Sequence, residues 1–382
     1  MIPYGRQDIQ QADIDAVLEV LESDFLTQGP RVPEFEAKLA GHVGAKHGVA
    51  VNSATSALHI ACLALGLGQG DLLWTSPITF VASANAGLYC GADVDFVDIN
   101  ADTFNMCPQA LATKLAAAKT VGRLPRVVVP VALCGQSCDM AAIRDLADEY
   151  GFKILEDASH AIGGRYQRAF MGNGRYADIS VFSFHPVKII TTAEGGMAVT
   201  NDDALAQKME LLRSHGVTRN PDLMVGDSHG PWYYEQVDLG FNYRMTELQA
   251  ALGETQMDRL DTYVAARAAR AAEFDRALAD LPLDVPQQHP DTASSWHLYV
   301  IRVHDPVQHR PLFEALRADG IGVNLHYIPV HTQPYYQNLG FKDGDFPAAE
   351  AYYARAISIP LYAIMTDADQ AEVVRVLRKH LT

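Results

Sequence analysis

The chain has 382 residues, of which 48% are hydrophobic and 20% charged, a balance typical of a globular protein rather than a disordered or fibrous one. It carries 30 Lys and Arg against 46 Asp and Glu, and its net charge of -16 argues against nucleic acid or anionic membranes as partners. The N-terminus lacks a basic segment followed by an apolar run, and no apolar stretch is long enough to span a bilayer. We therefore expect a cytoplasmic protein.

The first predicted element is a helix near the N-terminus. Ile14, Val17, Leu18 and Leu21 recur at helical spacing. This spacing predicts a helix that lies against the large domain.

Seven short runs rich in β-branched residues then alternate with helix-like stretches between about residues 47 and 200. Seven strands with helical crossovers predict a mostly parallel sheet covered on both faces, hence an α/β fold. The runs are HGVAVN, DLLWTS, VDFVDI, RVVVPVAL, FKILED, DISVFSF and GGMAVT.

The C-terminal part begins with a predicted bridging helix. Residues 246–249 (TELQ) have the form of a capping box and open an Ala-rich helical stretch toward Leu281. Strands are predicted at 298–303 and 322–325, and a final helix near 367–381. We expect a large domain over residues 1–255 and a smaller α+β domain over residues 256–382.

Two of the loops that follow predicted strands contain groups suited to an anionic, ring-containing ligand. Ligands of parallel sheets bind beyond the carboxyl ends of the strands. Residues 53–58 (SATSAL) open a helix whose free N–H groups and hydroxyls can hold a phosphate, although a plain N-cap gives the same pattern. Asp157 ends the fifth run and can bond a protonated ring nitrogen, although a surface acid is the alternative.

Two further loops supply a lysine and an aromatic ring. Lys188 lies close to a predicted buried strand, and a lysine in apolar surroundings becomes a nucleophilic amine, as Schiff-base chemistry requires. An exposed loop lysine is the usual alternative. Phe80 can stack on a pyridine ring or belong to the core. Each signal is weak alone, but a phosphate site, an acid, a ring and a lysine together indicate pyridoxal 5'-phosphate (PLP).

Other cofactor classes lack their motifs. The glycines of residues 66–70 (GLGQG) have the wrong spacing for a dinucleotide and follow a helix-like stretch. There is no HExxH, P-loop or G-x-S-x-G motif, and the 14 histidines are scattered without ligand spacing, so we expect no metal site. The five cysteines are an odd number without a CxxC pair, which argues against a disulfide framework.

The strings SATSAL, TFVASAN, EDASHAIG, SFHPVK, TTAEGG and FNYRMTELQAALG resemble the sugar aminotransferases of the DegT/DnrJ/EryC1/StrS family over essentially the whole chain. The resemblance implies fold type I of the PLP-dependent transferases, as in aspartate aminotransferase, and a homodimer with shared active sites. Relatives with histidine in place of the lysine are dehydratases, so Lys188 favours transamination.

The resemblance also implies the roles of individual residues. Lys188 would carry PLP as a Schiff base and act as the catalytic base and acid, Asp157 would pair with the ring nitrogen, and His160 would lie near the ring and its phenolic oxygen. The remaining cofactor contacts would be Ala54, Thr55 and Ser183 at the phosphate, Phe80 on the ring and Asn242 from a second subunit. Positions near the nucleotide-sugar would be Tyr4, Thr27, Gln28, Gly29, His326 and Tyr327.

The expected reaction moves an amino group from L-glutamate to C4 of a UDP-linked 4-keto-6-deoxy-N-acetylhexosamine. Segments such as RSHGVTRN and LHYIPVHTQPYYQ carry this narrower resemblance. One alternative is a sister enzyme acting on a different 4-keto or 3-keto sugar. Another is a non-catalytic regulatory protein with the same fold.

Overall fold

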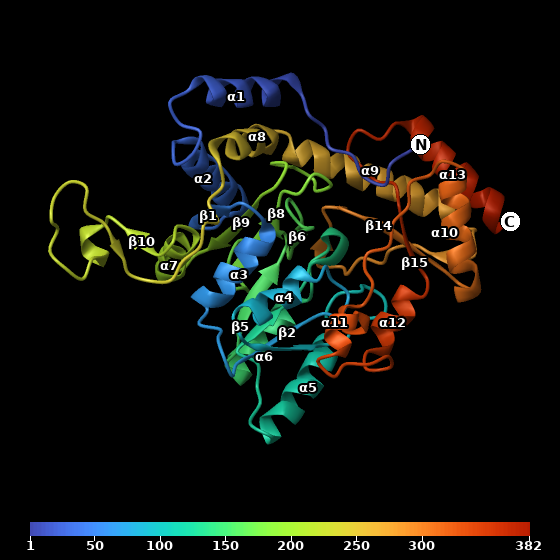
Figure 1. Ribbon diagram of the computed structural model, residues 1–382. Coiled ribbons are helices and arrows are strands. Elements are labelled where there is room, and N and C mark those ends of the chain that lie inside the picture. The colour runs from blue at the N-terminus through green and yellow to red at the C-terminus, as the bar shows by residue number, and fades with distance from the viewer.

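A seven-stranded sheet forms the centre of the larger part of the chain in the computed structural model, which describes residues 1–382 (Figure 1). Only β9 runs against its two neighbours, so the predicted mostly parallel sheet is confirmed. In sheet order the strands are β1 (His47–Val51), β9 (Gly196–Thr200), β8 (Ile179–Ser183), β5 (Lys153–Asp157), β4 (Val127–Val129), β2 (Leu72–Thr75) and β3 (Asp93–Phe96).

Helices cover both faces of this sheet because alternate strand residues point to opposite sides. On β4, Val127 and Val129 pack with α3, α4 and α7, whereas Val128 packs with α5 and α6. A third core cluster lies between β9, α2 and α8. The bounds are α2 (Arg31–Val43), α3 (Ala54–Ala64), α4 (Ala82–Tyr89), α5 (Pro108–Thr120), α6 (Met140–Tyr150), α7 (Asp203–Arg213) and α8 (Glu247–Met257).

The N-terminal helix α1 (Gln11–Glu22) packs on α8, as expected, but not through the apolar repeat. Its buried residues are Asp13, Ala16 and Val20, whereas Leu18 and Leu21 are exposed. The reason is electrostatic: the buried Asp13 carboxylate accepts two hydrogen bonds from Arg259, at 2.7 and 2.8 Å, and fixes the rotation of the helix.

The predicted helical stretch from residue 246 is two helices. The capping box is present, with Thr246 accepting from the backbone of Gln249, and α8 ends at Met257. Helix α9 (Leu260–Leu278) then begins after Arg259, whose ψ of 0° interrupts the helical conformation. Arg259 is also the partner of Asp13, so the break lies where α1 is attached.

Short β elements extend from this framework. Strands β6 (Arg165–Tyr166) and β7 (Ala169–Phe170) form a small sheet with β13 (Thr292–Ala293). Strands β10 (Val217–Thr218) and β11 (Glu235–Gln236) form the base of an arm, residues 217–240, which projects from the body in Figure 1 and includes η2 (Pro221–Leu223). The arm exposes Val225, Trp232 and Leu239.

A second sheet, in the order β12-β14-β15, forms with α10 and α13 the core of the C-terminal part. The final helix, Asp367–Leu381, agrees with the prediction. The predicted strand at 322–325 is wrong: that segment makes only an isolated bridge, Asn324 to Ser358, with Ile321 bridged to Ile2 beside it. The remaining bounds are η1 (Leu133–Gly135), β12 (Leu283–Asp284), β14 (Tyr299–Val303), η3 (Pro306–Gln308), α10 (His309–Ala318), η4 (Val330–Thr332), α11 (Pro334–Gln337), α12 (Pro347–Tyr353), β15 (Ala356–Ile359) and α13 (Asp367–Leu381).

C-terminal segments also pack on the first sheet, since Val330, Tyr336 and Tyr352 belong to the same core cluster as β2 and β4. The boundary near residue 255 stays a prediction.

No helix of the chain has the length and apolar character needed to cross a membrane.

Candidate active site

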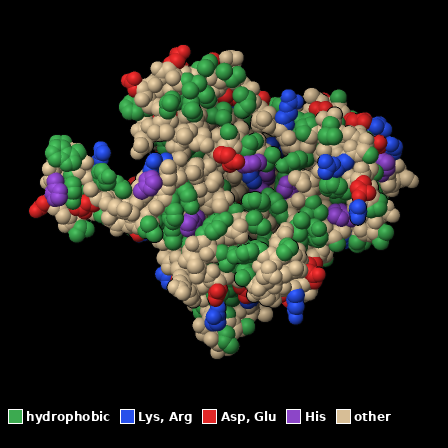
Figure 2. Space-filling model, viewed as in Figure 1, with side chains coloured by type: hydrophobic (Ala, Val, Ile, Leu, Met, Phe, Trp, Pro, Cys, Tyr) green, Lys and Arg blue, Asp and Glu red, His purple; other side chains and the backbone are tan.

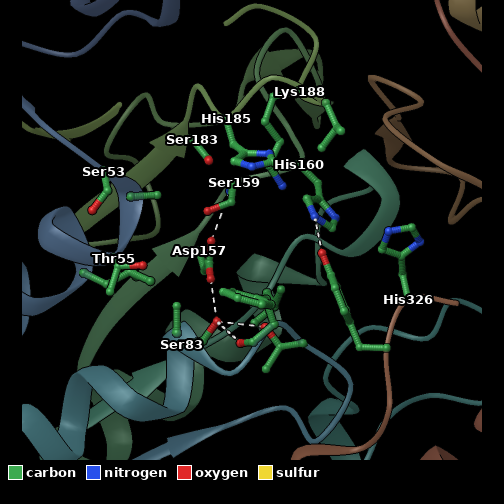
Figure 3. Close-up of a pocket in the computed structure, with 18 of the residues that line it drawn as sticks. Ser53, Thr55, Ser83, Asp157, Ser159, His160, Ser183, His185, Lys188 and His326 are labelled. Carbon is green, nitrogen blue, oxygen red and sulfur yellow. Dashed lines mark hydrogen bonds between the residues drawn. The ribbon is translucent and has the colours of Figure 1, made fainter. Parts of the chain in front are cut away.

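A cavity of about 470 Å³ lies beyond the carboxyl ends of β5 and β8, where the starts of α3 and α4 meet irregular C-terminal segments. Figure 2 shows histidine, basic and acidic atoms gathered near the middle of the viewed face, and Figure 3 shows the side chains that line the cavity. The predicted site residues that line it are Tyr4, Ala54, Thr55, Phe80, Asp157, His160, Ser183, Lys188, His326 and Tyr327.

Lys188 presents a free amine to this cavity. Strand β8 ends at Ser183, and the following turn is closed by the Lys188 N–H, which donates to the His185 carbonyl oxygen at 2.8 Å. The Nζ atom makes no hydrogen bond within the chain. Burial lowers the pKa of Lys188 to about 8, and the Asp157 carboxylate opposes this shift in part. A neutral, nucleophilic amine is therefore accessible near neutral pH.

Asp157 is the last residue of β5 and is held at both carboxylate oxygens. β5 runs parallel to β8, and Asp157 lies opposite Val181 in register, so the acid and the lysine belong to neighbouring strand ends. The Ser159 N–H donates to Oδ1 at 3.1 Å, and the Ser83 hydroxyl donates to Oδ2 at 2.6 Å. Asp157 is 5% exposed, so these two donors set the orientation of its carboxylate.

The start of α3 offers unpaired donors. Ser53 caps the helix by accepting from the Ser56 N–H at 3.1 Å, while the N–H groups of Ala54 and Thr55 have no partner in the chain. Strand β9 passes close by, and a Cβ on Gly196 would meet Ala54 N at 2.5 Å, so glycine is required there.

Ser53 therefore caps the helix, as the N-cap alternative expects, while phosphate binding at the same helix start stays a prediction. The hydroxyls of Thr55 and Ser183 line the same cavity. Two free amides at a helix N-terminus with two hydroxyls fit a phosphate group in number and polarity.

His160 is held as a neutral imidazole on the opposite wall. The Cys134 N–H donates to Nδ1 at 3.3 Å, so the ring proton is on Nε2, which lies 3.1 Å from the Tyr327 hydroxyl. Burial lowers the pKa of His160 well below its usual value, and the charge on Lys188 adds to the shift.

The same wall carries His326 and Tyr4. Burial lowers the pKa of His326 to about 4, and its Nδ1 lies 2.8 Å from the Ser358 hydroxyl. The Tyr4 and His326 rings are in contact, with centroids 5.5 Å apart. This side of the cavity is therefore uncharged and rich in rings.

Four predicted residues do not line the cavity. Thr27, Gln28 and Gly29 lie in the loop between α1 and α2, where Thr27 and Gln28 are exposed. The Asn242 side chain is exposed and makes no hydrogen bond within the chain, while its backbone bridges to Ser214. The roles of these four residues stay predictions.

Several cavity residues have no role in the sequence-based prediction: Thr79, Ser83, Ser159, His185, Val187 and Glu194. Ser83 lies within the TFVASAN segment, but nothing local distinguishes it from other small helix residues. Its partner, Asp157, is 74 residues away in the sequence, so only the folded structure reveals the contact.

A free amine, a fixed carboxylate and a helix start with two free amides, at the strand ends of a mostly parallel sheet, are the groups expected in the site of a PLP-dependent enzyme. The chain belongs to the DegT/DnrJ/EryC1/StrS aminotransferase family, whose profile matches residues 7–378.

Relatives of known sequence match nearly the whole chain. The spore coat polysaccharide biosynthesis protein SpsC of Bacillus subtilis is 42% identical, over 99% of this chain and 96% of the relative. The UDP-4-amino-4,6-dideoxy-N-acetyl-beta-L-altrosamine transaminase of Campylobacter jejuni is 38% identical, over 96% of this chain and 93% of the relative.

Solved structures agree with this assignment. Helicobacter pylori PseC, an aminotransferase of pseudoaminic acid biosynthesis, superposes with a TM-score of 0.90 at 33% identity, over 100% of this chain and 99% of that one. The PLP form of the putative sugar aminotransferase Spr1654 from Streptococcus pneumoniae has a TM-score of 0.88 at 29% identity, with 100% of both chains covered. The protein is a PLP-dependent sugar aminotransferase with the aminotransferase fold.

Proposed function

We propose that the protein transfers the amino group of L-glutamate to C4 of a UDP-linked 4-keto-6-deoxy-N-acetylhexosamine, which yields UDP-4-amino-4,6-dideoxy-N-acetyl-β-L-altrosamine and 2-oxoglutarate. The observation that carries the amino transfer is the Lys188 amine, free in the cavity and with a pKa near 8. The choice of sugar rests on the transaminase from Campylobacter jejuni at 38% identity.

The cofactor would be held at three points. Ala54, Thr55 and Ser183 would bind the phosphate, Asp157 the ring nitrogen, and Phe80, 58% exposed at the cavity wall, one face of the ring. When bound, PLP supplies a carbonyl carbon that accepts the amino group and a conjugated ring that takes up electrons.

Lys188 would move the protons of both half-reactions. Its neutral amine removes the proton from Cα of glutamate, and in the second half-reaction it delivers a proton to C4 of the sugar. A pKa near 8 suits both tasks, because the neutral and protonated forms are both populated near neutral pH. The uncharged wall of His160, His326 and Tyr327 would face the substrate without competing for these protons.

A homodimer with shared active sites completes the proposal. The Asn242 side chain is exposed and has no hydrogen bond within its own chain, although its backbone carbonyl oxygen accepts from Asn52 at 3.4 Å, so the side chain is free to meet a second subunit. The apolar side chains exposed on α1 and on the arm, such as Leu18 and Trp232, support burial against a second subunit. Asn242 would then reach the phosphate held by the partner.

Mixed dimers test the shared site. Lys188→Ala and Asn242→Ala are each expected to be nearly inactive as pure proteins. If the two residues meet across an interface, a heterodimer of the variants contains one site with both changes and one with neither, so activity reappears on mixing. No recovery, with heterodimers shown to form, would place Asn242 outside the partner's site.

A second candidate acceptor is another 4-keto or 3-keto nucleotide-sugar, because the polysaccharide biosynthesis protein SpsC is the more similar relative, at 42% identity. UDP-linked 4-keto-6-deoxy-N-acetylhexosamines of both C5 configurations, offered separately with glutamate, distinguish the candidates. The measurements are 2-oxoglutarate release and the mass of the amino-sugar. Equal or greater turnover of a different keto-sugar would contradict the proposed acceptor, and no turnover with any acceptor would contradict the wider proposal.

A further inference from the structure

A chain of buried hydroxyls leads to Asp157 from the start of α4. Thr79 Oγ1 lies 2.7 Å from Ser83 Oγ, and Ser83 Oγ lies 2.6 Å from Asp157 Oδ2 (Figure 3). Thr79 and Ser83 are 2% and 1% exposed, so water does not compete for these bonds. All three residues line the cavity.

The direction of donation along this chain follows from proton counting. A carboxylate only accepts, and a hydroxyl has one proton to donate. Ser83 therefore donates to Asp157, and its own oxygen accepts from Thr79. Successive donation in one direction strengthens each bond, and a bond to a charged acceptor is stronger than one between neutral groups.

We propose that Ser83 is a positioning residue, which acts through Asp157 on the cofactor. The inference rests on the proposed role of Asp157 as the partner of the ring nitrogen. With Ser83 on Oδ2 and the Ser159 N–H on Oδ1, rotation of the carboxylate is blocked from both sides. A carboxylate held in one orientation costs less to align with a ring N–H than one that is free to rotate.

The chain contains a matched control one residue away. The Ser180 hydroxyl donates to Glu156 Oε2, also at 2.6 Å, and both residues are buried. Glu156 precedes Asp157 on β5, so its side chain lies on the other face of the sheet and is not part of the cavity. Burial also raises the pKa of Glu156. If the Ser83 bond only satisfied a buried hydroxyl, removing either serine would have the same effects on PLP affinity and on kcat.

The test compares Ser83→Ala, Ser180→Ala and Thr79→Val. Each variant is freed of cofactor and titrated with PLP, and its dissociation constant and visible absorption band are recorded. The kcat and KM for glutamate are then measured. Ser83→Ala should weaken PLP binding and lower kcat by about tenfold each, with the KM for glutamate within about twofold. Thr79→Val, which keeps Ser83, should change the PLP dissociation constant and kcat by about threefold or less.

Ser180→Ala should leave PLP affinity, spectrum and kcat within about twofold of the parent protein, although loss of a buried bond lowers its thermal stability. Unchanged PLP affinity and spectrum in Ser83→Ala, or equal losses in Ser83→Ala and Ser180→Ala, would overturn the proposal. If Ser83→Ala does not fold, the proposal requires that Thr79→Val weaken PLP binding measurably more than Ser180→Ala does. PLP affinity does not depend on the acceptor sugar, so failure of the proposed sugar reaction would leave this comparison intact.

Discussion

The two walls of the cavity are built in different ways. Asp157 ends β5, and Lys188 lies in the turn after the adjacent parallel strand β8, closed by the bond from its N–H to the His185 carbonyl oxygen. Tyr4, His326 and Tyr327 lie in irregular segments near isolated bridges. Under the proposed function, the strand-end wall would hold the groups that move protons, and the C-terminal wall would contact the sugar. Substitutions in the strand-end wall should lower kcat or weaken cofactor binding. Substitutions in the C-terminal wall should raise the KM for the keto-sugar.

The largest effect is expected from Lys188→Ala. Without its amine no base remains to move the proton, so turnover should fall by more than about 10⁴-fold, while PLP still binds through the phosphate donors and Asp157. Borohydride treatment should fix PLP to the peptide that contains Lys188 in the parent protein and to no peptide in the variant. Lys153→Ala, at the exposed start of β5, is the control and should retain activity. Label on another lysine of the parent protein would contradict the assignment.

Asp157→Asn should have the next largest effect. The amide keeps the size of the carboxylate but loses the charge that stabilises a protonated ring nitrogen, so kcat in both half-reactions should fall about a hundredfold. Single-turnover absorbance measures each half-reaction. Glu156→Gln, on the other face of β5, should stay within about twofold. If only PLP affinity fell and the rate at saturating PLP stayed normal, Asp157 would be a binding residue alone.

The pH dependence of PLP attachment tests the lysine environment. The neutral amine is the nucleophile, and the pKa of Lys188 is lowered to about 8, so the rate constant should rise about tenfold per pH unit below 8 and level off above it. Rapid mixing of cofactor-free protein with PLP measures this rate. A rate constant that keeps rising up to pH 10 would show that Lys188 has an ordinary pKa. It would contradict the burial of its amine.

Tyr327→Phe, on the C-terminal wall, should have the smallest effect. The variant loses the hydroxyl that meets His160, so the KM for the keto-sugar should rise about fivefold with kcat within about twofold. Tyr299→Phe is a matched control, since the Tyr299 hydroxyl donates to Asp275 in the core of the C-terminal part, away from the cavity. A loss confined to kcat would show that Tyr327 takes part in the reaction steps. The two walls would then no longer differ in their effects on kcat and KM.

The predictability of the site from sequence follows the same division. Strands alternating with helices predict a parallel sheet, and in such a sheet the positions after each strand converge, which is why Asp157, Lys188 and Thr55 could be proposed together from the residues alone. No such periodicity locates Tyr4 or His326, and only the family resemblance indicated them.

The errors of the fold prediction have a related cause. The apolar repeat of α1 predicted a buried face, but a buried ion pair between Asp13 and Arg259 determines which side of the helix packs. The segment 322–325 has strand-like composition but lacks a regular strand partner. The buried side of α1 and the lack of a strand at 322–325 both depend on residues distant in sequence, which local patterns do not reveal.

Antiparallel β9 joins the edge strand β1 to the rest of the sheet, with His47 opposite Thr200. During synthesis the first edge strand emerges long before its neighbour, and contacts between such distant segments form slowly. The proposed phosphate donors are the start of α3, which follows β1, and Ser183, the last residue of β8, so they come together only once this edge has closed. A ligand that binds only the closed form shifts the equilibrium toward it. The supply of PLP should therefore affect how much of the newly made chain survives in its folded form, as well as how fast that chain turns over.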